Sequence, residues 1–300
     1  MTPVDVSICI ATYRRPAGLR DLLASIERQE TERALCVEII VVDNSPPDAE
    51  NIVEEAASAS RFAVRYLTQP EQNISLTRNV AVSAATGTWL WFVDDDEIAD
   101  PNCLDRLLTA AQTHNADAVF GPVRSSFPEP PAEWMQELFE RPISTTGAIS
   151  TANRTSNTLV RRDLLATVDG PFDVAYGKSG GSDSFLFRQL ANAGARLIDS
   201  SDAFVTEEVP PNRATLAWLR RRHRVQGQNY ARQTVTLAGT RRSLDVVQVA
   251  AKAVAQVIFS FASMGLNWGK KTDRERSRLR LLTNVGKLEG LWGTTSVRDA

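Results

Sequence analysis

The sequence predicts an α/β fold, in which a doubly wound and mainly parallel sheet is followed by a helical extension. Short apolar runs alternate with helical patterns over residues 1–120, as in βαβ units joined by right-handed crossovers. The chain has 300 residues, of which 43% are hydrophobic, enough for a large core. The last sixty residues carry a long apolar segment and then a basic one, and both have helical character.

The elements of the predicted sheet follow from local patterns. The strands are expected at 4–11, 37–42, 63–68, 89–93 and 116–120, and the helices between them at 17–29, 47–60, 76–85 and 101–113. In the first helix, Leu19, Leu22, Leu23 and Ile26 recur at helical spacing. We expect Ser75 to cap the third helix.

Four carboxylates follow directly on the apolar strand at 89–93. They are Asp94, Asp95, Asp96 and Glu97. Adjacent carboxylates repel one another, and open α/β sheets bind ligands beyond the carboxyl ends of their strands. We therefore expect a hard divalent cation, Mg²⁺ or Mn²⁺, that bridges to substrate phosphates. The alternative is a solvated acidic turn that caps the next helix.

Polar side chains also follow the first two predicted strands. Thr12, Tyr13 and Arg14 come after the first strand, and Asp43 and Asn44 end the second. Both loops should open on the same rim as the acidic cluster. There a carboxylate can accept a hydrogen bond from a base or a ribose, and an arginine can meet phosphate. A helix N-cap or an Asx-turn is the alternative for the carboxylate.

The helix before the acidic strand begins with another polar pair, Arg78 and Asn79. They are either further contacts to a nucleotide ligand or part of a solvated helix face. Neither a Gly-x-Gly-x-x-Gly nor a Walker lysine loop follows the first strand. That argues against a dinucleotide oxidoreductase and a P-loop ATPase, and favours a nucleoside diphosphate held through a metal.

The pattern changes after residue 120. Five prolines mark a loop-rich insertion at 121–157, where acceptor specificity is expected. A short strand is predicted at 158–161, a glycine-rich loop at 177–183, a helix at 184–193, and two strands at 196–198 and 203–206. A strongly basic helix at 215–233 carries Arg220 and His223.

The composition and the N-terminal segment indicate which partners and which cellular compartment to expect. The net charge of −2 argues against a nucleic-acid partner. Three sparse cysteines favour a reducing compartment. The N-terminus lacks a signal-peptide pattern, so we expect a cytoplasmic active site.

The apolar segment at 243–264 is followed by a basic one at 270–280. It is interrupted by polar residues and predicts no confident membrane span. An interfacial helix with a polybasic anchor, on the cytoplasmic face of the inner membrane, is one interpretation. Packing on the catalytic domain or on a second subunit, as in a homodimer, is the other.

Three segments, 6–15, 41–45 and 91–97, together resemble the family-2 glycosyltransferases with the GT-A fold, a Rossmann-like sheet. The resemblance is close over 4–125 and looser to about 235. It implies a nucleotide-sugar donor, with a UDP-sugar favoured, and an inverting transfer to a glycan or lipid-linked acceptor, as in bacterial polysaccharide synthesis. It divides the chain into a donor half at 1–120, an acceptor and catalytic half at 121–235, and a helical extension at 236–300.

The resemblance also implies roles for the residues on the donor side. It puts Thr12, Tyr13 and Arg14 around the nucleotide and Asp43 on its base. Asp94 and Asp96 match the outer members of the DxD motif, with Asp96 as direct metal ligand.

On the acceptor side, the resemblance makes Asp183 the general base, although Ser182 stands where the family has Glu. A plain N-cap is the alternative for Asp183. The Gln-x-x-Arg-Trp motif of processive synthases is absent, so transfer of a single sugar is favoured. Arg220 and His223 stand in that region, either adding positive charge at the diphosphate or facing anionic lipid.

Two other function classes remain open. A sugar nucleotidyltransferase also uses such a sheet and a metal, but the loop at 12–16 lacks the glycines it usually needs. A non-catalytic sugar-nucleotide-binding assembly subunit would not require the acidic pair or Asp183.

Overall fold

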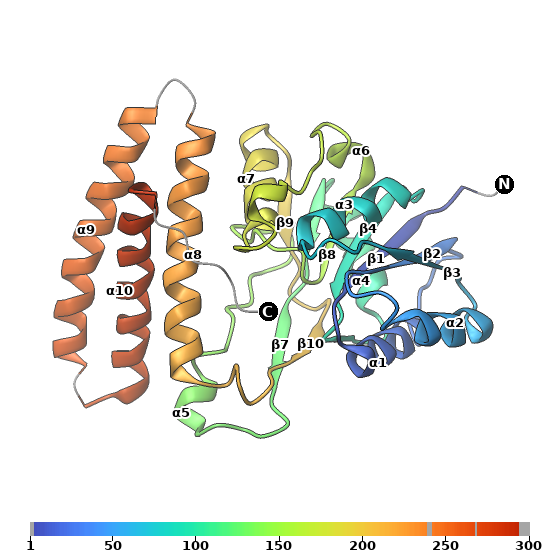
Figure 1. Ribbon diagram of the computed structural model, residues 1–300, viewed down its shortest axis with the longest axis horizontal. Coiled ribbons are helices and arrows are strands. Elements are labelled where there is room, and N and C mark those ends of the chain that lie inside the picture. The colour runs from blue at the N-terminus through green and yellow to red at the C-terminus, as the bar shows by residue number, and fades with distance from the viewer. Residues whose placement is uncertain (1–2, 239–241, 268, 294–300) are drawn as a thin grey trace. The chain divides into compact units, whose positions relative to one another are not determined.

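The structure, a computed structural model, describes residues 3–238, 242–267 and 269–293 (Figure 1). The chain forms two compact units. The sheet unit comprises Met1–Ser126, Arg141–Lys178 and Ser182–Glu208. The helical unit comprises Phe127–Glu140, Ser179–Gly181 and Val209–Ala300.

The sheet unit is built on a seven-stranded sheet of order β3-β2-β1-β4-β8-β6-β9. The strands are β1 Val6–Thr12, β2 Val37–Asp43, β3 Ala63–Thr68, β4 Trp89–Asp94, β6 Ala118–Phe120, β8 Thr158–Arg161 and β9 Leu197–Asp199. Among the strands of this sheet that the structure describes, only β8 runs antiparallel to its neighbours. The predicted mainly parallel sheet is confirmed, and the strand predicted at 158–161 lies in its middle.

Helices cover both faces of this sheet (Figure 1). They are α1 Pro16–Glu27, α2 Glu50–Ala59, α3 Ile74–Ala84, α4 Cys103–Thr113, α6 Arg162–Leu165 and α7 Ser182–Asn192. Successive residues of a strand point to opposite faces. Trp91 therefore packs in the core with α1, α2 and α4, while Phe92 packs in the core with α3, α6 and α7.

The cap predicted for the third helix is wrong. Asn73 caps α3, because its side chain accepts hydrogen bonds from the amides of Ser75 (3.0 Å) and Leu76 (3.3 Å). Its side-chain oxygen thereby satisfies amides that the first helical turn leaves unpaired. Ser75 already lies inside the helix.

A second sheet joins three short strands, β5 Glu97–Ala99, β10 Val205–Glu208 and β7 Val123–Ser126, in the order β5-β10-β7. β10 pairs antiparallel with β5 and parallel with β7. Two of these strands, β5 and β7, are absent from the predicted elements, because three or four residues are too few to show a period. The acidic turn consequently lies between β4 and β5.

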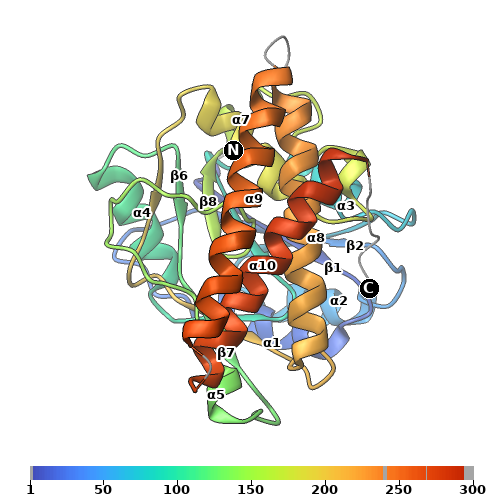
Figure 2. The ribbon, with the colours of Figure 1, turned by 90° about the vertical axis from the view of Figure 1, so that its left-hand side faces the viewer.

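The helical unit contains α5 Glu133–Gln136, α8 Leu216–Leu237, α9 Arg242–Leu266 and α10 Lys271–Leu291 (Figure 2). α8 and α10 approach closely at glycines. A Cβ on Gly227 would lie 2.0 Å from the Thr283 carbonyl oxygen, and one on Gly286 would lie 2.1 Å from that of Arg224. The four-residue spacing between Gly286 and Gly290 keeps both on one side of α10, facing α8.

Candidate active site

The carboxyl ends of three strands meet at one edge of the large sheet. In the strand register, Thr12 pairs with Asp43, and Ala11 pairs with Asp94. The polar residues that follow β1, β2 and β4 are therefore neighbours, as expected from the sequence.

Arg15 is the cation nearest to the acidic turn. Its Nη1 donates to Asp95 Oδ1 at 3.0 Å and also to Asp96 Oδ2. Asp95 is buried and accepts two further hydrogen bonds, from Thr12 Oγ1 (2.9 Å) and the Tyr13 amide (3.3 Å). Asp95 thus fixes the loop after β1. The sequence analysis did not select Arg15, because nothing local shows that it lies against carboxylates eighty residues away.

Negative charge in the turn is only partly compensated. Burial and the charge of Asp94 together raise the pKa of Asp96 to about 6, while Arg15 opposes the shift. Burial and Asp94 likewise raise the pKa of Glu97 well above its usual range. Glu97 accepts from the Ser156 hydroxyl at 2.6 Å and from the Asp94 amide at 2.9 Å. A cluster of this kind favours the arrival of a further cation.

The side chains of the acidic turn provide only some of the ligands that a metal ion needs. No three His, Cys, Asp or Glu side chains form a metal site within residues 3–238, 242–267 and 269–293. Asp94 and Asp96 offer hard carboxylate oxygens. Mg²⁺ is usually held by one or two carboxylates, with water and substrate phosphates as its other ligands. The turn therefore fits a divalent cation that arrives with a diphosphate.

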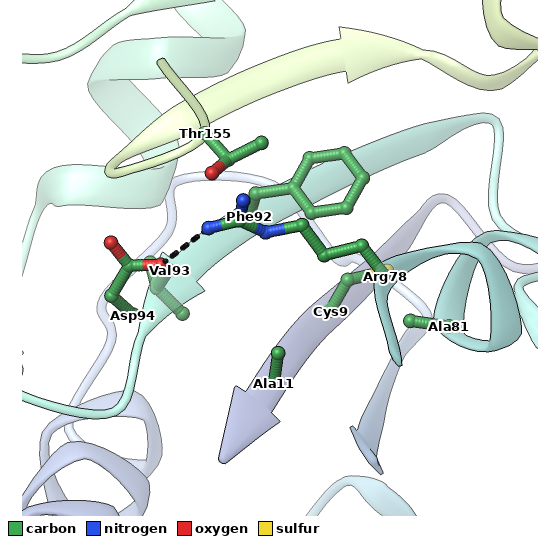
Figure 3. Close-up of a pocket in the computed structure, with 8 residues that line it drawn as sticks. All are labelled: Cys9, Ala11, Arg78, Ala81, Phe92, Val93, Asp94 and Thr155. Atoms are coloured by element: carbon green, nitrogen blue, oxygen red, sulfur yellow. Dashed lines mark hydrogen bonds and ion pairs between the residues drawn. The ribbon is translucent and has the colours of Figure 1, made fainter. Parts of the chain in front are cut away.

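Arg78 reaches the acidic turn from α3. Its Nη2 lies 3.2 Å from Asp94 Oδ1, and Figure 3 shows the side chain extending across a hollow toward that carboxylate. The hollow has a cavity volume of about 10 Å³, which is about the room that one water molecule needs. Ligand pockets usually have roughly 300–1,000 Å³, so a nucleotide sugar would have to bind along the open rim.

Thr155 lines the same hollow (Figure 3). Thr155 is 1% exposed, and its Oγ1 has no hydrogen-bond partner among the described residues. A buried hydroxyl left unpaired costs free energy, so native proteins rarely retain one without a reason. Thr155 is therefore a candidate ligand contact, which the sequence did not reveal because 155 lies in the loop-rich insertion.

Asp43 and Asn44 are engaged in shaping the rim. Asp43 is fully buried, and its carboxylate accepts from the amides of Ser45 (2.7 Å) and Ala49 (3.0 Å) and from the Tyr66 hydroxyl (2.9 Å). This is the Asx-turn that was one alternative for the position. The Asn44 amide donates to the carbonyls of residues 69 and 71. The contact of Asp43 with a base stays a prediction.

Tyr13 and Arg14 lie beside Asp43 at the rim. Arg14 has a φ of 53°, in the left-handed region that few side chains adopt. Its amide donates to the Ser45 hydroxyl at 3.0 Å, and its guanidinium lies 5.1 Å from the centre of the Tyr13 ring. The loop therefore holds a positive charge and an aromatic ring together at the expected nucleotide position.

Asn79 makes a different contact from the one expected. Its Nδ2 donates to the Phe172 carbonyl at 2.8 Å, and its Oδ1 accepts from the Phe172 amide at 2.9 Å. Both ends of the side-chain amide are thus used to hold the loop at Phe172. A contact of Asn79 with the nucleotide stays a prediction.

Asp183 is the second residue of α7, where its Oδ1 accepts from the Ser184 amide at 2.8 Å. The guanidinium of half-buried Arg154 lies in the electrostatic field of both Asp183 and Glu97. Burial lowers the pKa of Arg154 and Arg141 lowers it further, while Glu97, Asp199 and Asp183 raise it. Arg154 Nε has no hydrogen-bond partner among the described residues. The sequence analysis missed this arginine for the same reason as Thr155.

Arg220 and His223 lie on α8 and contact α10. Arg220 Nη2 is 2.7 Å from Glu275 Oε2, and His223 Nδ1 is 3.0 Å from the Thr283 hydroxyl. Burial lowers the pKa of His223 to about 4, and the charge of Arg222 contributes. This lowered pKa counts against a charged His223, and its contribution of positive charge at a diphosphate stays a prediction.

Comparison with known proteins identifies relatives over the whole chain. Residues 7–169 match the profile described as Glycosyl transferase family 2. The succinoglycan biosynthesis protein ExoM of Rhizobium meliloti is 34% identical over 301 residues, which cover 99% of this chain and 95% of ExoM.

Solved structures share the fold at low identity. The mannosyltransferase PcManGT from Pyrobaculum calidifontis, in complex with GDP-Man and Mn²⁺, has a TM-score of 0.67 at 20% identity, covering 96% of this chain and 87% of that one. S. aureus TarS 1-349 in complex with UDP has a TM-score of 0.53 at 16% identity, covering 97% and 92%.

Proposed function

Because the chain belongs to glycosyl transferase family 2, we propose that it moves one sugar from a nucleotide-diphosphate sugar to a hydroxyl of a bacterial glycan or lipid-linked acceptor. The chain is a glycosyltransferase with the GT-A fold. The observation that carries the proposal is the edge of the sheet at which Asp94 and Asp96 face Arg15 and Arg78. Carboxylates that can take a metal stand there beside guanidinium groups that can take a diphosphate.

The relatives support this choice of donor and pathway. ExoM, which this chain matches along its full length, is described as a succinoglycan biosynthesis protein. TarS has been solved with UDP-GlcNAc and PcManGT with GDP-Man and Mn²⁺. We favour a UDP-sugar as donor, Mn²⁺ or Mg²⁺ as the metal, and exopolysaccharide synthesis as the setting.

In the proposed reaction Asp183 acts as general base. An acceptor hydroxyl has too high a pKa to attack unaided, so a carboxylate must take its proton as the new bond forms. Asp183 lies in the first turn of α7. The acceptor oxygen attacks the anomeric carbon on the side opposite the diphosphate, the bond to the diphosphate breaks, and the configuration inverts.

Arg15 and Arg78 stabilise the leaving group in this scheme. The departing nucleoside diphosphate gains negative charge, and positively charged side chains that are already in place lower the barrier. A divalent cation held by Asp94 and Asp96, when bound, would neutralise more of that charge. Thr155 would supply a hydrogen bond to the donor from the hollow beside Arg78.

We assign donor binding to residues 1–120 and acceptor binding to residues 121–235. We place the reaction in the cytoplasm, at the membrane surface when the acceptor is lipid-linked. Contacts of Tyr13, Arg14 and Asp43 with the nucleoside, and of Arg220 with the diphosphate, belong to the same proposal.

A nucleotide screen tests the donor site. Thermal unfolding is followed with UDP, GDP, dTDP and CDP, each with Mn²⁺ and with EDTA. A ligand that binds only the folded state raises the melting temperature. We expect one diphosphate, UDP, to do so in a Mn²⁺-dependent way, and expect Asp96→Asn to lose the effect. No shift with any nucleotide in the wild-type protein would contradict the proposal.

A further inference from the structure

Large apolar side chains gather on the outer face of α9, where the described residues leave them exposed together with Lys252. Six of the twelve large hydrophobic side chains that are exposed in the described structure lie on this one helix. They are Val247, Val254, Ile258, Phe259, Phe261 and Leu266, exposed by 48% to 88%. The segment Asp245–Leu266 is long and apolar enough to cross a membrane by composition, yet only 17% of its most apolar window is buried.

The side of α9 that packs inward mixes small, apolar and polar residues. Ala253 and Ser260 are buried, Val257 is half-buried, and Ser263 Oγ lies 2.9 Å from Ser277 Oγ of α10. A helix of a water-soluble bundle turns its bulkiest apolar side chains inward. In α9 both phenylalanines and the isoleucine face outward instead. Packing through small and polar residues, with bulky apolar residues outside, is typical of helices whose outer face meets lipid.

Charged residues of α10, which packs against α9, decide between a helix that spans a membrane and one that lies on its surface. The 25 residues of α9 would be roughly 37 Å long, enough to span. However, Lys287 Nζ of α10 lies 3.5 Å from Gln256 Oε1 in the middle of α9, and Arg278 and Arg280 of α10 are exposed. Spanning would carry these charges into hydrocarbon, which is costly. A position in the interface, with only the outer face of α9 immersed, avoids this cost.

We propose that the outer face of α9 docks on a membrane surface that carries anionic headgroups, with the helix lying in the plane of the interface. Exposed Lys270 and Lys271 lie at the start of α10, four and five residues after the end of α9, where they can meet anionic headgroups at the edge of the immersed face. Lys271 Nζ also lies 3.9 Å from the centre of the Trp134 ring. This inference concerns the helical unit alone and does not depend on the identity of the donor.

Vesicle sedimentation of the full chain tests the docking surface. The vesicles contain phosphatidylcholine with or without phosphatidylglycerol. The triple variant Ile258→Gln, Phe259→Gln, Phe261→Gln is compared with wild type. The matched control replaces three equally exposed side chains of the sheet unit, Ile143→Gln, Ile149→Gln and Val174→Gln.

We expect the wild type and the control to bind the anionic vesicles and the α9 variant to bind at least about tenfold more weakly, since three immersed apolar groups are lost. Lys270→Glu with Lys271→Glu should weaken binding at low salt and much less at high salt. This pair serves as a second probe if the triple variant does not fold. The UDP-induced thermal shift should survive in every variant.

Three results would overturn the proposal. The wild type could fail to bind either vesicle, or the α9 variant could bind like wild type. Light scattering could instead show a stable dimer that the α9 substitutions convert to a monomer, which would make this face an interface between two copies. A lost nucleotide shift with intact vesicle binding would count against the proposed donor and leave the docking surface standing.

Discussion

Replacing Asp96 by Asn should stabilise the metal-free protein while removing its response to Mn²⁺. Burial and Asp94 move the pKa of Asp96 from 3.8 to about 6. Between these values the folded state binds more protons than the unfolded state, so stability falls as pH rises through this window. At about 1.36 kcal/mol per pKa unit, the ionised carboxylate costs up to about 3 kcal/mol above pH 6.

The expected gain is smaller than this upper bound. Asn keeps an oxygen that can accept from Arg15, but it gives up the ion pair with that guanidinium. We expect Asp96→Asn to raise the free energy of unfolding by about 1 to 3 kcal/mol at pH 8 and by close to zero at pH 4. Urea unfolding in EDTA at both pH values measures the difference. Asp163→Asn, at an exposed carboxylate paired with Arg161, is the matched control and should change stability by less than about 0.5 kcal/mol.

Two outcomes would refute the reasoning. If Asp96→Asn is less stable than wild type at pH 8, the ion pair with Arg15 outweighs the repulsion within the turn. If the variant is more stable but keeps its Mn²⁺-dependent nucleotide shift, Asp96 is not a ligand of the metal. The first result would remove the argument that the turn is built to receive a cation, and the second would remove Asp96 from the proposed metal site.

Four further predictions address the base, the hollow, the acid limit of stability and the helix packing. Asp183→Asn should lower the transfer rate by roughly 10²–10⁴-fold and leave the nucleotide-induced thermal shift intact; full activity in a donor-release assay would exclude it as the base. Thr155→Val should stabilise the free protein by about 1 kcal/mol, because it removes an unpaired buried hydroxyl, while raising KM for the donor; an unchanged KM would exclude the contact. The pKa of His223 lies near 4 instead of 6.5, so the folded state binds fewer protons in that window and stability is lost as pH falls through it. His223→Gln should remove up to about 3 kcal/mol of this dependence in unfolding titrations between pH 7 and pH 4, and an unchanged slope would contradict the assignment. Gly286→Ala should lower the melting temperature, at a cost of about 1–3 kcal/mol, because its Cβ would meet the Arg224 carbonyl. Gly265→Ala, with open space around it on α9, should stabilise the protein by up to about 1 kcal/mol, and equal effects of the two would count against close packing at α10.

The sequence by itself determined the sheet and the place of its rim. Strand and helix patterns are local, and parallel strands joined by helices must open their carboxyl ends on one edge. Thr12, Asp43 and Asp94 could therefore be placed together, and the register confirms their proximity. The family resemblance was visible for the same reason, because its motifs are the short segments that end these strands.

Only the tertiary structure decided which charges meet and which faces stay uncovered. Arg15 contacts Asp95 and Asp96 across eighty residues of sequence, and no local pattern encodes such a pair. Burial lowers the pKa of His223, and that burial depends on how α8 and α10 pack. The apolar character of α9 was plain from its composition, but a helical pattern does not say which neighbours cover it. Burial and long-range contact are properties of the folded chain, and they set the electrostatics of the rim and the exposure of α9.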